Sequence, residues 1–383
     1  MINRKETKKI YVGNVPVGGN SMISIQSMTN TNTKDIKSTV SQIKKLEDAG
    51  CDIIRMAVND LEDAEALREI KKDINIPIIS DIQFDYKLAL AAAKNESDAI
   101  RLNPGNIGDS WKIKEVIEAC KFYNIPIRVG VNSGSVKQEF LDKFNGVNAS
   151  SICYSAMEEI EILEKNNFYD IAVSLKASNV NLTIESYRKF SEMSNYPLHL
   201  GVTEAGSPKK GIVKSAIGIG TLLAEGIGDT IRVSLTSDPL DEVITGKDIL
   251  KALDLRREGI DLISCPTCAR TKVDLIEIVN KAEERLYELD KNLKVAIMGC
   301  AVNGPGEARE ADIGIACGDG EGLIFKKGQI IKKIPEEKLL VELLKEIENI
   351  GWLLDFIKRY FTKIKLSLWK YFGWYCHWVY KKK

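Results

Sequence analysis

The amino-acid sequence lacks several features that mark common classes of protein. Its 54 basic and 54 acidic side chains cancel, so it has no general basic face suited to nucleic acid. Its start, residues 1–5, leads into no apolar signal region, which favours a cytoplasmic location over secretion. No Gly-x4-Gly-Lys-Ser/Thr phosphate loop occurs. Gly218-Ile-Gly220 has Leu223 where a dinucleotide loop needs its third glycine, and the segment instead predicts a helix.

Cysteine has the most informative spacing in the chain. Eight cysteines without a secretion signal indicate a reducing compartment, with free thiols or metal ligands rather than disulfides. Two residues separate Cys265 from Cys268, a spacing that lets two thiolates chelate one metal centre. Cys300 follows on a Gly-rich turn. Soft thiolates favour zinc or an iron–sulfur centre. Three other cysteines lie in helical or strand-like patterns typical of buried structural residues: Cys51, Cys120 and Cys153.

A metal site normally needs one donor more than these three cysteines provide. Cys317 would complete a four-cysteine set, for which zinc is the natural interpretation. Glu307 follows Cys300 across an Asn-Gly-Pro-Gly turn that would fold its carboxylate back onto the metal, and Glu310 is a third candidate. An oxygen ligand on an otherwise thiolate-bound cluster would hold its iron weakly and leave it open to a substrate oxygen. These residues alone leave zinc and iron–sulfur both open.

Short β-rich runs alternate with amphipathic helical patterns from Ser21 to Leu235. Repeated strand–helix units predict a parallel sheet, and eight of them predict a closed (β/α)8 barrel of the TIM type. An open doubly wound sheet is the alternative. The predicted strands are residues 22–26, 53–58, 76–80, 99–102, 125–131, 171–175, 198–202 and 230–235.

The cysteines fall in a second, smaller α/β region. We expect the barrel to occupy residues 1–258 and the cysteine-containing domain residues 259–350. In the second domain the pattern predicts strands at 261–264 and 294–298, a helix at 273–289, and hairpin-like strands at 312–316 and 322–325. The domain would therefore be built around the cysteines.

Residues 351–383 differ in composition from the rest. They contain eight Lys or Arg against one acid, and four of the five tryptophans. Such a basic, aromatic, amphipathic pattern is typical of a helix that contacts a membrane interface. It carries too many charges to span a membrane. A disordered or accidental appendage is the alternative interpretation.

Basic residues interrupt five of the apolar strands near their carboxyl ends, where a barrel of this kind has its active site. Each alone is equally well a buried ion-pair member or a side chain reaching for water. Closure of the barrel would bring all five together, and converging cations need a multiply charged anion. Guanidinium groups fit phosphate oxygens, so the expected ligand is a phosphate or diphosphate. The five residues are Arg55, Arg101, Arg128, Lys176 and Arg232.

Small polar loops and one acid also follow the predicted strands. Residues 103–106 and 132–135 form turn-like loops with backbone N–H groups available to an anion. Glu204 is the one acid immediately after the seventh strand, so proton transfer is its expected role and pairing with an arginine the alternative. His199 lies inside that strand and is expected to be packed and hydrogen-bonded rather than catalytic.

Several segments in combination resemble the 4-hydroxy-3-methylbut-2-enyl diphosphate synthase family, iron–sulfur enzymes of the non-mevalonate isoprenoid pathway. The resemblance covers about residues 1–350. Ala269 stands where the family commonly has glycine, and residues beyond 351 have no counterpart. The segments that carry it are residues 100–106, 129–134, 198–206, 229–235, 265–270 and 298–308.

The resemblance implies a barrel followed by a [4Fe–4S] domain and a specific reaction. That reaction is the reductive ring opening of 2-C-methyl-D-erythritol 2,4-cyclodiphosphate with loss of water, using two electrons from flavodoxin or ferredoxin. It also implies head-to-tail homodimers in which one subunit's cluster domain closes over its partner's barrel mouth. The implied cluster ligands are Cys265, Cys268, Cys300 and Glu307.

Roles for the barrel residues follow from this resemblance. Glu204 is the expected acid–base group, and Asn132 and Asn303 are expected to position the substrate. Two other classes of function stay open on the residues alone: a zinc-containing barrel that binds phosphorylated metabolites, and an electron-transfer module. The residues expected to hold the cyclic diphosphate are Arg55, Arg101, Arg128, Lys176, Arg232 and Ser234.

Overall fold

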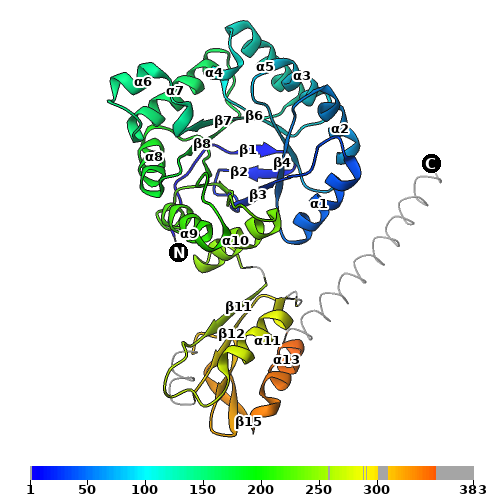
Figure 1. The fold of residues 1–383 in the computed structure, drawn as a ribbon, viewed down its shortest axis with the longest axis vertical. Helices are drawn as coiled ribbons and strands as arrows, with labels where there is room; N and C mark the ends of the chain where they lie inside the picture. Colours follow the sequence, from blue (N-terminus) through cyan, green and yellow to red (C-terminus); the bar gives the residue numbers. More distant parts are fainter. Residues whose placement is uncertain (1, 258, 288, 290, 301–308, 351–383) are drawn as a thin grey trace, which may run out of the picture. The chain divides into compact units, whose positions relative to one another are not determined.

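The computed structural model describes residues 2–257, 259–287, 289, 291–300 and 309–350. Contacts within the chain divide it into two compact units, with the division between Arg256 and Arg257. The first unit contains the predicted barrel and the second the cysteine motifs (Figure 1). The basic tail, residues 351–383, lies outside the described residues, as do Asn303 and Glu307.

The first unit is a ring of eight parallel strands surrounded by helices (Figure 1). The strands are β3 (Ser24–Met28), β4 (Ile53–Ala57), β5 (Ile78–Asp81), β6 (Ala99–Leu102), β7 (Ile127–Asn132), β8 (Ile171–Lys176), β9 (His199–Leu200) and β10 (Thr230–Ile231). They are ordered β8-β7-β6-β5-β4-β3-β10-β9, and a parallel bridge between Val173 and Leu198 joins β8 to the start of β9. The predicted barrel is therefore confirmed, and the doubly wound alternative is wrong.

Two strands are shorter than the sequence predicts. The expected strands at 198–202 and 230–235 are represented by two-residue β9 and β10. Hydrogen bonding nevertheless continues for one step, because the N–H of Arg232 donates to the carbonyl of Leu200 at 2.9 Å. The backbone beyond that point forms loops that carry candidate site residues.

Amphipathic helices cover the outside of the ring. Several begin at an Asp or Asn whose side chain accepts a backbone N–H of the first turn, as Asp35, Asp60 and Asn148 do. Gly218 and Gly220 lie inside one of these helices, as predicted. The helices are α1 (Ile36–Asp48), α2 (Leu61–Lys71), α3 (Tyr86–Lys94), α4 (Pro104–Ile107), α5 (Ser110–Tyr123), α6 (Gln138–Lys143), α7 (Ala149–Lys165), α8 (Val180–Met193), α9 (Pro208–Ala224) and α10 (Pro239–Ala252).

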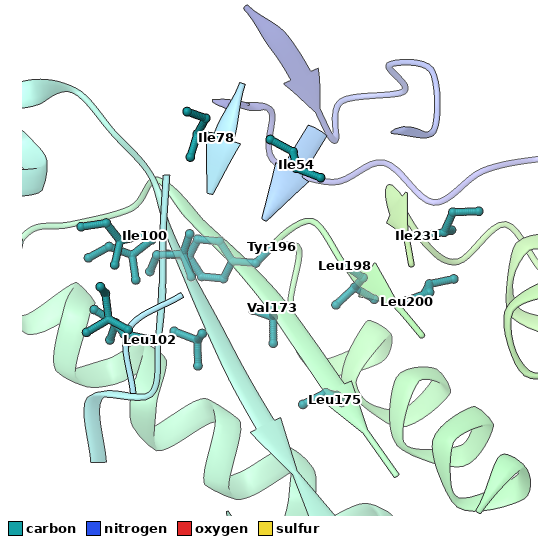
Figure 2. Close-up of a cluster of buried hydrophobic side chains, with 14 of the residues drawn as sticks. Ile54, Ile78, Ile100, Leu102, Val173, Leu175, Tyr196, Leu198, Leu200 and Ile231 are labelled. Carbon is teal, nitrogen blue, oxygen red and sulfur yellow. The ribbon is translucent and has the colours of Figure 1, made fainter. Parts of the chain in front are cut away.

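The main apolar core lies between the ring of strands and the helices. Figure 2 shows side chains of this layer, among them Ile54, Ile100 and Val173 from three different strands. All three are fully buried. Because successive side chains of a strand point to opposite faces, the neighbours of these isoleucines and valines point into the barrel. This alternation turns the basic residues inward.

A short hairpin, which the sequence analysis missed, covers the amino-terminal end of the barrel. It pairs β1 (Ile10–Val12) with β2 (Val15–Val17). Ile10, Val12 and Val17 pack against residues near the starts of barrel strands, including Ile53 and Ala99. With one end of the barrel covered in this way, the carboxyl end is the side on which the polar residues gather.

In its described residues, the second unit is a five-stranded sheet with two α-helices. Its strands are β11 (Ile260–Ser264), β12 (Leu293–Met298), β13 (Ile313–Cys317), β14 (Glu321–Lys326) and β15 (Gln329–Pro335), in that order. The first three are parallel and the last three antiparallel. The helices α11 (Leu275–Tyr287) and α13 (Leu339–Asn349) share one apolar core with the sheet. The strand β15 and the helix α13 had not been predicted.

Within the described residues, no helix is both long enough and apolar enough to cross a membrane.

Candidate functional site

Five basic side chains gather at the carboxyl end of the barrel. Four come from different strands and Arg232 directly follows β10, and each follows or precedes a residue of the outer core layer, as Arg55 follows Ile54. Their charges influence one another: the guanidinium groups of Arg55, Arg232 and Arg128 all act on the pKa of Lys176. The structure thus brings together all five cations named from the sequence, Arg55, Arg101, Arg128, Lys176 and Arg232.

Two buried carboxylates hold three of these cations in place. Asp81, the last residue of β5, lies 3.6 Å from Nε of Arg55 and 3.2 Å from Nη1 of Arg101. Glu242, in the first turn of α10, accepts from Nε of Arg232 at 3.3 Å and from Nη2 at 3.4 Å. Both acids are buried. They fix the direction in which the arginines point.

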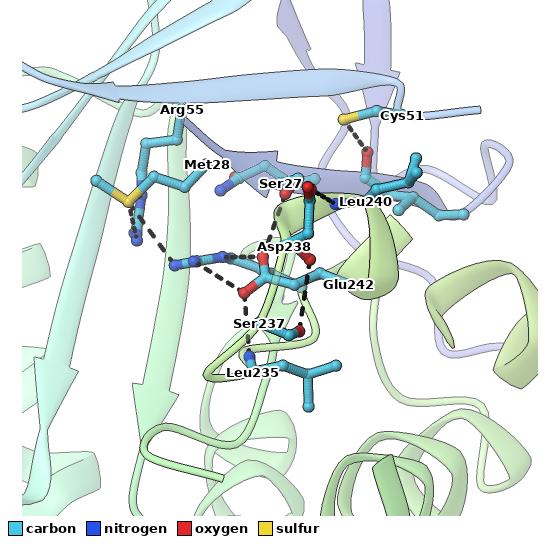
Figure 3. Close-up of polar contacts among 12 residues, drawn as sticks. Ser27, Met28, Cys51, Arg55, Leu235, Ser237, Asp238, Leu240 and Glu242 are labelled. Atoms are coloured by element: carbon cyan, nitrogen blue, oxygen red, sulfur yellow. Dashed lines mark hydrogen bonds and ion pairs between the residues drawn. The ribbon is translucent and has the colours of Figure 1, made fainter. Parts of the chain in front are cut away.

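Glu242 also connects the arginine to the neighbouring backbone (Figure 3). Its carboxylate accepts from the hydroxyl of Ser27 at 3.2 Å and from the N–H of Leu235 at 3.1 Å. The second contact holds the loop that contains half-buried Ser234, one of the predicted diphosphate ligands. One acid therefore positions both Arg232 and the loop after β10.

The described acids only partly balance the charge of the cation cluster. Burial lowers the pKa of Arg55 to about 10, although Asp81 partly opposes the effect. Burial, followed by the other guanidinium groups, lowers the pKa of Arg128 and Lys176 well below their ordinary values. No acid of the described chain forms an ion pair with either of these two. A lowered pKa of a base means that its charged form is disfavoured, so the cluster is arranged to gain from binding an anion.

Two glycines in the barrel wall make room for the cations. A Cβ atom on Gly130, in β7, would lie 3.1 Å from both Nε and Nη2 of Arg101. A Cβ atom on Gly201, just after β9, would lie 3.1 Å from Nζ of Lys176. A side chain at either position would crowd these charged groups, which would then have to shift. The glycines therefore have a packing role in the site.

A second polar layer lies one step deeper in the barrel. Arg128 is 4% exposed, and its Nη1 donates to Oε1 of Gln26. His199 is fully buried, and its carbonyl accepts the hydroxyl of Tyr187. Neither ring nitrogen of His199 has a hydrogen-bond partner in the described part of the chain. Burial, followed by the charge of Arg128, lowers the pKa of His199 well below its ordinary value, which favours the neutral ring. His199 is thus packed as expected, but its ring lacks the expected hydrogen bond.

Two backbone N–H groups in the loops after β6 and β7 are already engaged. The N–H of Gly105 donates to Oδ1 of Asn103 at 3.0 Å and to Oε2 of Glu159 at 2.8 Å. The N–H of Asn132 donates to the hydroxyl of Ser135 at 3.0 Å. The expectation that these loops offer free N–H groups to an anion is wrong for these two. The half-buried Asn132 side chain stands at the end of β7, beside the cation cluster in sequence and register.

Glu204 lies in the loop after β9 and is exposed. Its backbone has φ = +53°, a left-handed conformation that is uncommon for residues other than glycine, asparagine and aspartate. Backbone conformations of this kind are found preferentially at functional sites. No ion pair joins Glu204 to an arginine among the residues that the structure describes.

The cysteine motifs follow two adjacent parallel strands of the second unit. Cys265 comes directly after β11, and Cys300 follows β12 with Gly299 between them. Since Ser264 of β11 is paired with Ile297 of β12, both motifs leave the sheet at the same edge. The N–H of Gly299 donates to Sγ of Cys265 at 3.1 Å. This contact places the two segments side by side.

Cys268 is exposed in the loop after Cys265. Its N–H donates to Oγ1 of Thr271 at 3.3 Å, and its sulfur lies 3.9 Å from the same hydroxyl. The N–H of Arg270, followed by the Thr271 hydroxyl, lowers the pKa of Cys268 and so favours the thiolate. N–H groups directed at sulfur are a feature of iron–sulfur sites. The donor set of these loops therefore suits a thiolate-bound metal centre.

The three candidates for a fourth ligand are Glu307, Glu310 and Cys317. Glu307 lies outside the described residues, and Glu310 is exposed. Cys317 is fully buried at the end of β13, and burial raises its thiol pKa to about 12. In the described ranges, no three Cys, His, Asp or Glu side chains are already placed to hold a metal ion. The three cysteines suit an iron–sulfur cluster, because they supply thiolate donors and follow strands that end at the same edge of the sheet.

Comparisons with known proteins match both units. The family model described as the GcpE TIM-barrel domain matches residues 7–247, and the GcpE protein C-terminal domain matches residues 261–349. The chain belongs to the GcpE family. Full-length relatives of this GcpE family member are 4-hydroxy-3-methylbut-2-en-1-yl diphosphate synthases (flavodoxin). That of Clostridium perfringens is 61% identical and covers 91% of this chain and 100% of its own. That of Ruminiclostridium cellulolyticum is 58% identical, covering 91% and 99%.

A solved dihydropteroate synthase from Stenotrophomonas maltophilia is also similar to this GcpE family member, at 13% sequence identity. Its TM-score is 0.49, and the match covers 65% of this chain and 97% of that one.

Sequence reasoning missed several residues of the GcpE barrel mouth. Asp81 and Glu242 hold the arginines, and Met28 contacts two of them. Asp81 ends an apolar strand, a position that a search for charged strand ends would have found. Glu242 is on a helix and Met28 is apolar, so neither carried a signal in the linear pattern.

Proposed function

We propose that the chain reduces 2-C-methyl-D-erythritol 2,4-cyclodiphosphate to 4-hydroxy-3-methylbut-2-enyl diphosphate, with opening of the ring and loss of water. The observation that carries this proposal is the group of five cations at the barrel mouth, to which the described protein supplies only two carboxylates. A doubly phosphorylated substrate would provide the missing negative charge. Membership of the GcpE family supports the same substrate.

The barrel residues bind and orient the substrate in this proposal. Guanidinium groups bind phosphate oxygens through paired hydrogen bonds, and Lys176 adds a point charge at the centre of the group. Asn132, Asn303 and Ser234 position the rest of the molecule. Glu204, exposed in a strained loop conformation, supplies the proton for the departing hydroxyl group. The residues that hold the diphosphate are Arg55, Arg101, Arg128, Lys176 and Arg232.

The second unit provides the redox half of the site. Cys265, Cys268, Cys300 and Glu307 would hold a [4Fe–4S] cluster. The position of Cys265 and Cys300 just after the paired strands β11 and β12 supports the part of these two cysteines. Such a cluster, when bound, supplies electrons and a Lewis-acidic iron to a substrate oxygen. The Gly299 N–H orients the Cys265 sulfur for this purpose.

The proposal includes two protein partners. The electrons come from flavodoxin, which the names of the relatives print, or from ferredoxin. A head-to-tail homodimer would bring the cluster of one subunit to the barrel mouth of the other. We place this reaction in the cytoplasm.

Anaerobic purification of the full chain tests the proposal. We expect about four iron and four sulfide per chain, the content of one [4Fe–4S] cluster, and conversion of the cyclodiphosphate with reduced flavodoxin. A triple variant, Arg55→Ala, Arg101→Ala and Arg128→Ala, should retain iron but lose substrate binding. Zinc in place of iron would contradict the redox function and favour the zinc-containing alternative. Unchanged substrate binding by the triple variant would contradict the anion site.

A further inference from the structure

Met28 lies between two arginines of the cation cluster. It is the last residue of β3 and is half-buried. Its strand pairs with β4 on one side, where Met28 is opposite Arg55, and with β10 on the other side, shortly before Arg232. A side chain at this position reaches both guanidinium groups without any backbone movement.

Both arginines direct N–H groups at the sulfur of Met28. Nε and Nη2 of Arg55 lie 3.2 and 3.0 Å from Sδ, so one edge of that guanidinium is bonded to a single sulfur atom (Figure 3). Nη1 of Arg232 is 3.8 Å from the same atom. The side chains of these arginines are 12% and 15% exposed, so little water is available to replace the sulfur.

The Met28 sulfur is an uncharged acceptor, which affects how much positive charge the arginines can present to a phosphate. A thioether is a weak, polarisable and neutral hydrogen-bond acceptor. The two carboxylates nearby already contact the same arginines from other sides, Asp81 at Arg55 and Glu242 at Arg232. A third carboxylate would orient the guanidinium groups equally well, but it would also cancel the charge that attracts a phosphate. A neutral sulfur orients the groups and leaves the charge in place.

We propose that Met28 is a positioning residue for the diphosphate. Its sulfur holds Arg55 and Arg232 in the orientation in which they meet the phosphate oxygens, and its neutrality preserves the positive potential of the barrel mouth. The inference rests on the proposed function, because it assumes that the cluster binds a diphosphate. Met28 itself does not contact the reacting atoms.

Three substitutions of Met28 distinguish the effects of hydrogen-bond acceptance, side-chain packing and charge. Met28→Leu keeps the apolar volume and removes the acceptor. Met28→Gln has a similar length and restores a neutral acceptor, whereas Met28→Glu restores an acceptor and adds negative charge. Met56→Leu is the matched control, because Met56 is on the next strand, is fully buried, and belongs to the outer core instead of the barrel mouth.

Inorganic pyrophosphate is the probe, titrated calorimetrically into each anaerobically purified full-length protein in its oxidised state. We expect Met28→Leu to weaken binding about three- to tenfold, the range for loss of an ordinary hydrogen bond, because a thioether is a weak acceptor even for a charged donor. Met28→Gln should bind within about twofold of the unchanged protein by the same reasoning. Met28→Glu should bind most weakly and show a shallower dependence on salt, because it lowers the local positive charge. Met56→Leu should bind as the unchanged protein does.

Steady-state kinetics with the cyclodiphosphate provide the second readout. Met28→Leu should raise KM with a smaller change in kcat, since binding of the diphosphate is what the sulfur supports. Equal binding by Met28→Leu and the unchanged protein would overturn the inference. Met28→Gln binding as poorly as Met28→Leu would also overturn it, because packing and not hydrogen-bond acceptance would then be the role of Met28. Failure of the unchanged protein to bind pyrophosphate would instead contradict the proposed function.

Discussion

The charged side chains at the barrel mouth are arranged in a way that favours binding of an anion. Asp81 and Glu242 orient three arginines, while Arg128 and Lys176 form no ion pair within the described chain. Burial and mutual repulsion lower the pKa of both unpaired cations. A site of this kind stores unfavourable electrostatic energy that binding of a diphosphate releases.

Glu159, which lies outside the cation cluster, is also a buried ionisable group whose charged form is disfavoured. This residue of α7 is 1% exposed, and its carboxylate accepts the Gly105 N–H and lies 3.9 Å from Nζ of Lys137. Burial raises its pKa from 4.5 to about 7, against the opposing effects of Gly105 and Lys137, and with a small contribution from Glu158. The folded protein therefore keeps this proton at a pH where the unfolded chain has lost it.

We predict that Glu159→Gln changes the pH dependence of stability. Between about pH 4.5 and 7 the unfolded state binds fewer protons, so the stability of the unchanged protein falls as pH rises, by up to roughly 3 kcal/mol for this group. The glutamine variant has no carboxyl group to titrate here. Its free energy of unfolding, relative to that of the unchanged protein, should therefore increase from pH 5 to pH 8. Thermal unfolding followed by circular dichroism at pH 5, 6, 7 and 8 measures the difference.

Glu161→Gln is the control for that measurement. Glu161 is an exposed acid on the same helix, and its replacement should leave the pH profile unchanged. A constant difference between Glu159→Gln and the unchanged protein across this pH range would contradict the assignment.

Strands and helices determine which side chains can meet. In each barrel strand the alternation of faces sends isoleucine and valine to the helices and sends the cation inward, as Ile100 and Arg101 do on β6. Gly130 and Gly201 complete this arrangement by leaving space where a side chain would displace a cation. The helices contribute by packing, and α10 also contributes Glu242 directly.

The helix α9 offers a test of how closely the elements pack. A Cβ atom on Gly218 would lie 2.6 Å from Cγ2 of Val202, while one on Gly220 would meet nothing within 4 Å. We predict that Gly218→Ala destabilises the protein by about 1–3 kcal/mol through overpacking. Gly220→Ala should stabilise it by about 0.5–1 kcal/mol, because alanine loses less backbone entropy in a helix. Denaturant unfolding of both variants measures these changes.

The two glycine variants serve as controls for each other, since they share one helix and one substitution. Changes of the same sign in both would contradict the packing described for α9.

The complete molecule divides its candidate chemistry between two units. The cations and Glu204 belong to the barrel, and the cysteines belong to the second sheet. Reduction of a bound diphosphate needs both sets of groups at the same place. The proposed head-to-tail dimer meets this need by forming each active site from two chains.

Complementation between subunits tests the shared site. We predict that Cys300→Ala and Glu204→Ala are each inactive, and that mixing them in equal amounts with subunit exchange restores about a quarter of full activity. Half of the dimers would then be mixed, and each mixed dimer would have one intact site of two. Activity is measured after exchange, with two affinity tags to show that mixed dimers have formed. No recovery of activity in demonstrated mixed dimers would contradict the shared site.

Local patterns were enough to predict much of this protein. The alternation of strands and helices predicted the barrel, because hydrophobic periodicity depends on neighbours within a few residues. The position of Arg55, Arg101, Arg128, Lys176 and Arg232 on five different predicted strands indicated that they would gather, since closure of a barrel follows from the number of strands. The spacing of Cys265 and Cys268 indicated a metal site for a similarly local reason.

Other features depended on contacts between residues far apart in the chain. Glu242 is 215 residues from Ser27, and Met28 is 204 residues from Arg232. Nothing in the sequence near these residues shows such partners, because strand register and the closure of the ring decide which side chains face each other. The same holds for Gly105, whose N–H donates to Glu159, a residue 54 positions away in the chain. Spacing along the chain indicated which groups would carry the chemistry, whereas barrel closure selected the residues that hold those groups in position.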